Sequence, residues 1–187
     1  MKRDYTDKFE MYVEENLQAF KRFPNSVKEE IEKSLRLRKS SIASFVAKCE
    51  TPIEQLLAVH LIDVEEHLYK ELTVLAEFKH LFVIPQKEVL ANGRKYRVDF
   101  LIECQTENKN YLFAIECDGH NFHEKTKEQA ARDKARERNL MKEGYTIIRF
   151  TGSEIWKSPS KCAVEAEKII SKTVGLVDYY EKLLDEE

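Results

Sequence analysis

The stretch that decides the fold is residues 97–156, in which an alternating segment is followed by an apolar run that ends in acidic residues, then by a polar segment and a second apolar run. Its informative parts read RVDFLI at 97–102, IECDGHNFH at 115–123, QAARDKARERNL at 129–140 and GYTIIRFTGSEIW at 144–156. Apolar and polar residues alternate over residues 95–104, and this period of two is typical of a half-buried strand. Residues 111–118 and 145–150 are predicted as two more strands, with a polar helix at residues 124–143 between them.

The alternation at residues 95–104 predicts which side chains share a face of the sheet. One face is expected to carry Tyr96, Val98, Phe100 and Ile102, and the opposite face Arg97, Asp99, Leu101 and Glu103. The helix before the last strand favours a parallel pair there, because parallel strands need a long crossover connection. We therefore expect a mixed sheet.

The flanking sequence adds one strand and several helices. A strand is predicted over residues 81–90, joined to the next one by a turn at Asn92-Gly93. Residues 1–72 read as helical, and the segment Thr51-Pro52-Ile53-Glu54 has the spacing of a helix start with a capping box. Ser158-Pro159 starts a long terminal helix in which Gly175 is a candidate break.

These elements define the fold class as α/β (α+β), with a mixed four-stranded sheet flanked by helices. Residues 1–50 are expected to form an N-terminal helical extension, and residues 51–187 the main domain.

The composition indicates a well-solvated globular protein. Apolar residues make up 42% of the 187 residues and charged residues 35%, with a formal net charge of −3. The four cysteines include no CxxC pair, which favours reduced thiols. No run approaches the roughly 18 apolar residues of a membrane span, and the N-terminus has no apolar signal core. We therefore expect a cytoplasmic protein with no membrane partner.

Three carboxylates are the strongest chemical signal. Asp99 lies in the middle of one predicted strand, while Glu116 and Asp118 share a face at the end of the next. Carboxylates that converge there repel each other unless a cation joins them, and oxygen ligands favour Mg²⁺ or Mn²⁺ over zinc. The alternative is that Asp99 pairs with Arg97 or Arg149, and that Glu116 and Asp118 cap the following helix.

The basic helix next to these carboxylates suits an anionic phosphate. We expect it to begin near Asp118-Gly119, so that its N-terminal end faces an anion. His123 and Lys127 are four residues apart, which places them on one face of that helix. The candidate nucleic-acid contacts are Lys125, Lys127, Arg132, Lys134 and Arg136. The alternative is a salt-bridged surface helix.

The carboxylates and the element order together resemble the PD-(D/E)XK nuclease superfamily, with its restriction-endonuclease-like core, and within it the very-short-patch-repair-like branch. The residues that carry the resemblance are Asp99, Glu116-Cys117-Asp118-Gly119, Phe122-His123, Asp133, Arg136, Gly144-Tyr145 and Arg149-Phe150. The resemblance covers about residues 51–170. It implies a metal-dependent endonuclease that hydrolyses phosphodiester bonds of DNA.

The resemblance also implies the ligands. Asp99 and Glu116 would hold a Mg²⁺ ion, for which Mn²⁺ could substitute, together with the backbone carbonyl of Cys117. Glu54 matches an acidic position that often completes such sites, and its alternative role is to cap a helix with Thr51.

One departure from the superfamily pattern affects the catalytic set. Asp118 replaces the lysine that normally follows the glutamate by two residues, so the resemblance places that role on Lys127, shared with His123. The catalytic candidates are therefore Asp99, Glu116, Asp118, His123 and Lys127. A catalytically inactive nucleic-acid-binding domain and a protein-interaction module using the helical N-terminus are the rival functions. The sequence does not decide whether the substrate is DNA or RNA, or whether the protein is a monomer or a homodimer.

Overall fold

The computed structural model describes residues 17–119 and 126–185, and divides the chain into two compact units, residues 1–43 and 44–187. The described part of the first unit is helical, with a break at residues 22–24 before the long helix α2, Asn25–Val46. No residue of α2 is buried. His123 and Lys125, two of the candidate site residues, lie outside the described residues.

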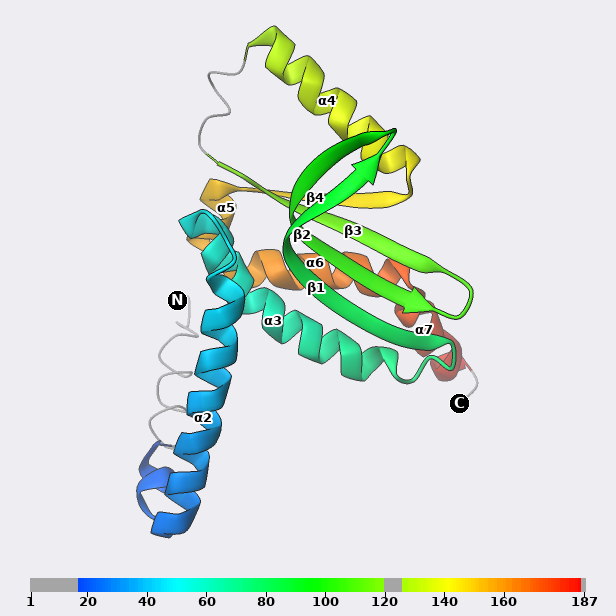
Figure 1. Ribbon diagram of the computed structural model, residues 1–187. Coiled ribbons are helices and arrows are strands. Elements are labelled where there is room, and N and C mark those ends of the chain that lie inside the picture. The colour runs from blue at the N-terminus through cyan, green and yellow to red at the C-terminus, as the bar shows by residue number, and fades with distance from the viewer. Residues whose placement is uncertain (1–16, 120–125, 186–187) are drawn as a thin grey trace, which may run out of the picture. The chain divides into compact units, whose positions relative to one another are not determined.

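The second unit is built on a sheet of four strands in the part of the chain that the structure describes. The strands are β1 (Phe78–Ala91), β2 (Arg94–Thr106), β3 (Asn110–Asp118) and β4 (Tyr145–Thr151). They lie in chain order; β1–β2 and β2–β3 are antiparallel, and β3–β4 is parallel (Figure 1). The mixed sheet and its fold class are confirmed. The Asn92-Gly93 turn has positive φ at both residues, as a two-residue hairpin of this twist requires.

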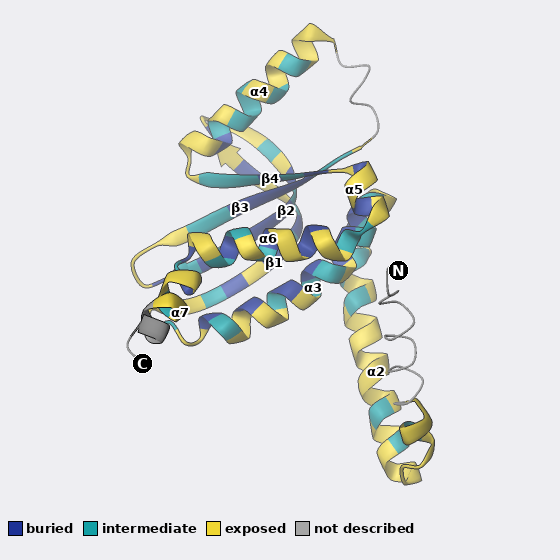
Figure 2. Ribbon diagram, turned by 180° about the vertical axis from the view of Figure 1, so that it is seen from behind, coloured by how far each residue is buried: buried dark blue, intermediate teal, exposed yellow. Residues whose placement is uncertain are grey.

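One face of the sheet is covered by α3 (Pro52–Leu72) and α6 (Pro159–Thr173), as Figure 2 shows from behind. The buried side chains of both helices are apolar apart from Glu54, and they form the larger core with Phe100, Ile102, Phe113 and Ile115 of the sheet. The terminal helix ends at Thr173, and Gly175, with φ of 85°, precedes a separate helix α7, Leu176–Asp185.

The short helix α5 (Gly152–Lys157) was not predicted. Thr151 caps it, since its side chain accepts from the Glu154 amide while the Glu154 carboxylate accepts from the Thr151 amide. Its first residue is in close contact with the end of β3: a Cβ on Gly152 would lie 3.3 Å from the Asp118 carbonyl oxygen. A glycine therefore lets α5 start directly beside that strand end.

The opposite face of the sheet is covered by α4 (Lys127–Lys142), whose Leu140 packs with Val98, Leu101 and Ala114. The helix begins at residue 127 and not at 124, because Thr126 and Gln129 form a capping box. The expectation that this helix begins near Asp118-Gly119 is therefore wrong, because Asp118 ends β3 and α4 begins at Lys127. That the N-terminal end of the helix faces an anion stays a prediction.

The predicted alternation of faces in β2 is only half correct. Phe100 and Ile102 face the larger core, but Val98 and Tyr96 pack on the α4 side together with Leu101. The face therefore changes at Asp99.

The same change occurs in the neighbouring strand. Leu81 and Val83 of β1 face the larger core, whereas Val89 lies on the α4 side. Between them stands Gln86, a non-glycine residue with φ of 52°. Pro85 pairs with Phe100 and Lys87 with Val98, so Gln86 and Asp99 face each other across a kink in both strands. Such irregularities re-aim side chains beside functional sites.

Candidate active site

Asp99 is held at the kink by the next strand. Its Oδ2 accepts a hydrogen bond of 2.7 Å from the backbone amide of Cys117. Burial raises the pKa of Asp99, and the negative charges of Glu54 and Asp118 raise it further, while the Cys117 amide and Arg136 act in the opposite direction. The alternative pairing of Asp99 with Arg97 is not observed, because Arg97 binds Glu50 through both guanidinium nitrogens at 2.7 Å.

Glu116 is the most deeply buried acidic group of the strand end, with 8% of its surface exposed. Arg136 of α4 donates from Nη2 to Glu116 Oε1 over 2.6 Å and from the same nitrogen to the Arg97 carbonyl over 2.7 Å. Burial raises the pKa of Glu116, and so does the charge of Asp99, whereas Arg136 and Arg149 lower it. Glu116 does not cap α4, since that cap is Thr126.

Glu54 is buried on α3, and its carboxylate accepts hydrogen bonds from three uncharged donors, two from the segment before α3 and one from β1. Oε2 accepts from the Glu50 amide at 2.9 Å and from Gln86 Nε2 at 2.7 Å, and Oε1 accepts from the Thr51 hydroxyl at 2.7 Å. The capping contact with Thr51 is therefore present. The same carboxylate is close enough to Asp99 to raise the pKa of that group. Capping the helix and facing the carboxylate site are compatible roles.

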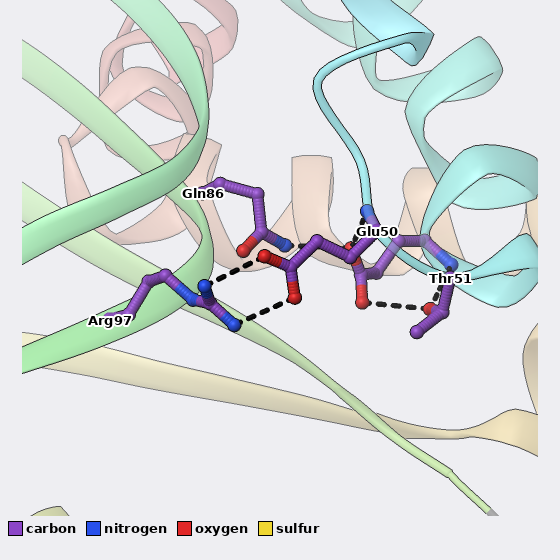
Figure 3. Close-up of polar contacts among 5 residues, drawn as sticks. Glu50, Thr51, Gln86 and Arg97 are labelled. Carbon is purple, nitrogen blue, oxygen red and sulfur yellow. Dashed lines mark hydrogen bonds and ion pairs between the residues drawn. The ribbon is translucent and has the colours of Figure 1, made fainter.

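Figure 3 shows how the segment before α3 is tied to the kinked hairpin. The Arg97 guanidinium donates to the Glu50 carboxylate just before α3, while the Gln86 amide donates to Glu54 in the first turn of α3. Gln86 Oε1 is buried and has no hydrogen-bond partner among the described residues. The network thus fixes the position of α3 against the residues that frame Asp99.

The donors that this site offers are hard oxygens. They are the carboxylates of Asp99 and Glu116, with the buried carboxylate of Glu54 close enough to act on Asp99. The Cys117 side chain packs toward the larger core, and burial with the charges of Asp99 and Glu54 raises the pKa of its thiol, so it is a neutral group. Over residues 17–119 and 126–185, no three side chains of His, Cys, Asp and Glu are arranged to hold a metal ion. The oxygen set suits Mg²⁺ or Mn²⁺ only if a backbone carbonyl or water completes it.

The basic residues of α4 divide into two kinds. Lys127, Arg132 and Lys134 are exposed, and none forms an ion pair with another described residue, so the salt-bridged alternative is not observed for them. Arg136 is different, because its half-buried side chain turns inward onto Glu116 instead of lying free for nucleic acid. Its position four residues before the buried Leu140 places both on the sheet-facing side of the helix, a signal in the sequence that was missed.

Asp118 lies at the strand end, pairs in register with Thr151 of β4, and is half-buried. Its charge contributes to the raised pKa of Asp99, which is the reverse of what a lysine at this position would do. Lys127 forms neither a hydrogen bond nor an ion pair with Asp99 or Glu116 in the part of the chain that the structure describes.

A mixed sheet with an aspartate on its second strand and a glutamate on its third, covered by helices on both faces, defines a restriction-endonuclease-like protein of the PD-(D/E)XK class. The sequence profile of the restriction-endonuclease-like family REase_MTES_1575 matches residues 66–170, more than half of the 187 residues, and the chain belongs to that family. Comparisons with curated proteins and with solved structures gave no match. Among the described residues, no helix is both long and apolar enough to cross a membrane.

Proposed function

We propose that this protein is a metal-dependent nuclease that hydrolyses phosphodiester bonds of DNA. The observation that carries the proposal is that the Asp99 and Glu116 carboxylates lie close together at the C-terminal end of β3, with the Glu54 carboxylate near Asp99. Desolvation of paired acidic groups is costly, and their pKa values are raised as a result. Family membership supports the same chemistry.

Asp99 and Glu116 would hold a Mg²⁺ or Mn²⁺ ion with the Cys117 carbonyl, and Glu54 would add negative charge behind them. When bound, such an ion polarises a phosphoryl oxygen and lowers the pKa of a water molecule. The Cys117 amide keeps Asp99 in place through the 2.7 Å hydrogen bond. Arg136 fixes the Glu116 carboxylate through the 2.6 Å hydrogen bond to its Oε1.

Lys127 and His123 are proposed to act on the reacting water or the leaving oxygen, because Asp118 stands where the superfamily pattern has a lysine. Lys127 is the first residue of α4 and is exposed, so its flexible amine can approach a phosphate bound at the strand end. Lys125, Lys127, Arg132 and Lys134 are proposed to contact the DNA backbone.

The experiment compares wild type with Glu116→Ala and Asp99→Ala on linear, nicked and single-stranded DNA, with Mg²⁺, Mn²⁺ or EDTA. We expect cleavage by wild type that EDTA abolishes and that both variants lose by at least about 10³-fold. Glu103→Ala, an acidic residue of β2 away from the site, is the matched control and should cleave as wild type does. Equal background cleavage by all four proteins would reject the proposal.

The second candidate is a non-cleaving DNA-binding domain of the same fold. Two observations favour it: Asp118 stands in place of the superfamily lysine, and the described side chains form no cluster of three metal ligands. Calorimetry separates the candidates, because the non-cleaving domain would bind DNA with a steep dependence on salt and would take up no Mg²⁺.

A further inference from the structure

The most exposed large aromatic side chain of the described residues is Trp156, at 69%. It is also the single tryptophan of the chain. An indole in water exposes a large apolar surface, and such side chains are enriched where proteins meet a partner. Its neighbour Ile155 is fully buried and anchors α5 in the larger core, so the indole stands on a fixed support.

The position of α5 brings Trp156 close to the candidate active site. Gly152, the first residue of the helix, lies against the Asp118 carbonyl at the end of β3, and Thr151 pairs in register with Asp118. A rise of about 1.5 Å per residue puts Trp156 only about 6 Å further along the helix axis.

Basic side chains accompany the indole. Lys157 follows it on α5, and Lys161 and Lys168 lie on the solvent side of α6. All three are exposed and form no ion pair with a described residue. Lys161 and Lys168 line a surface hollow of about 420 Å³ with Ser160, Val164 and Glu165. The hollow therefore presents two ammonium groups against one carboxylate.

We propose that this Trp156 surface, made of Trp156, Lys157, Ser160, Lys161 and Lys168, binds single-stranded DNA that leads to or from the cleaved phosphodiester. Trp156 stacks on an unpaired base, and the lysines bind phosphates on the α6 side. The inference rests on the proposed nuclease function and narrows its substrate to DNA with unpaired bases near the cut. Stacking needs an open base face, which a continuous duplex does not offer.

The test uses the fluorescence of the single tryptophan, which reports on Trp156 alone. The full chain is titrated in EDTA with a thymidine oligonucleotide of about ten residues and with a duplex of equal length. We expect the oligonucleotide to quench the fluorescence and to bind more tightly than the duplex. Trp156→Ala should weaken binding of the labelled oligonucleotide about tenfold, measured by anisotropy, because one stacked base contributes about that much.

Three variants serve as comparisons. Trp156→Phe should keep most of the affinity, since a phenyl ring also stacks. Leu90→Ala, at a similarly exposed apolar residue of β1 (65%), should bind as wild type does. The pair Lys157→Ala and Lys161→Ala should reduce the slope of log affinity against log salt by about one for each lysine.

The inference is overturned if the oligonucleotide binds without quenching, if Trp156→Ala binds it as wild type does, or if no oligonucleotide binds. These failures differ from failure of the nuclease proposal. If the protein cleaves DNA and Trp156→Ala binds the oligonucleotide as wild type does, only the Trp156 surface is rejected. If binding depends on Trp156 but no metal supports cleavage, the Trp156 surface is retained and the nuclease proposal is rejected.

Discussion

Arg136 donates a 2.6 Å hydrogen bond to Glu116, and this pair joins α4 to the strand that carries the candidate metal ligand. Both side chains are mostly shielded from water, with 20% and 10% of their surfaces exposed. A charge-assisted hydrogen bond in such surroundings is stronger than one at the surface.

Replacing Arg136 with Met should lower the free energy of unfolding by about 2 kcal/mol, because the buried Glu116 carboxylate loses its charged donor. Urea denaturation at neutral pH measures the loss. Lys95→Met is the control, since Lys95 and Glu88 form an exposed pair at 3.6 Å whose loss should change stability by less than about 1 kcal/mol. Equal effects of the two substitutions would contradict the role given to Arg136.

Asp99→Asn should make the metal-free protein more stable at pH 7.5. Burial raises the pKa of Asp99 in the folded protein above its ordinary value of 3.8. Between these two pKa values the folded chain binds more protons than the unfolded chain, so the free energy of unfolding falls as pH rises. An asparagine avoids this loss and still accepts the Cys117 amide.

The gain from Asp99→Asn should shrink as the pH falls through the raised pKa of Asp99 toward its ordinary value of 3.8, because the folded chain then takes up the proton. Thermal unfolding in EDTA from pH 4 to 8 follows the difference. Asp178→Asn is the control, because this side chain is exposed on α7 and is not desolvated on folding. A gain that did not depend on pH would show that charge is not its cause.

Gln86→Val should cost about 2 to 3 kcal/mol of stability. A β-branched residue tolerates the φ of 52° poorly, and valine cannot donate to Glu54 as the Gln86 amide does. Gln86→Asn should cost less, since asparagine is common in this backbone conformation. Chemical denaturation of both variants checks the order, and equal stabilities would mean that the backbone at Gln86 contributes no strain.

Lys127→Ala should lower the rate of DNA cleavage by about 10²-fold at saturating Mg²⁺ if its amine takes the place of the missing strand lysine. Lys142→Ala, at the other end of α4, is the matched control and should retain the wild-type rate. Calorimetric Mg²⁺ affinity should be the same in all three proteins, which separates a role in proton transfer or water positioning from one in metal binding. If Lys127→Ala cleaves DNA at the wild-type rate, Lys127 does not take the place of the strand lysine.

Most of the fold follows from local patterns. The strand and helix periods, the Asn92-Gly93 turn and the helix between the last two strands were enough to predict the mixed sheet and the helices around it. The capping boxes at Thr126 and Thr151 were also readable, as Thr-x-x-Gln and Thr-x-x-Glu, and they would have corrected the start of α4 and revealed α5.

The site was harder to predict because it depends on a departure from regular strand geometry. Regular alternation assigns Val98 and Phe100 to one face, whereas the kink at Asp99 separates them. No feature of the sequence marks Gln86 as a residue with positive φ. The partners of Asp99 and Glu54, a backbone amide and a distant glutamine, arise only when the strands and α3 pack together.

The anchoring of Asp99 by the Cys117 amide has a consequence for how the protein is made. During translation Asp99 leaves the ribosome before Glu116 and before the amide that holds it, and Arg136 follows later still. A prematurely terminated polypeptide that lacks β3 therefore has no assembled carboxylate site. The acidic centre forms only in chains whose synthesis has passed the third strand, so incomplete products cannot carry the chemistry proposed for the finished molecule.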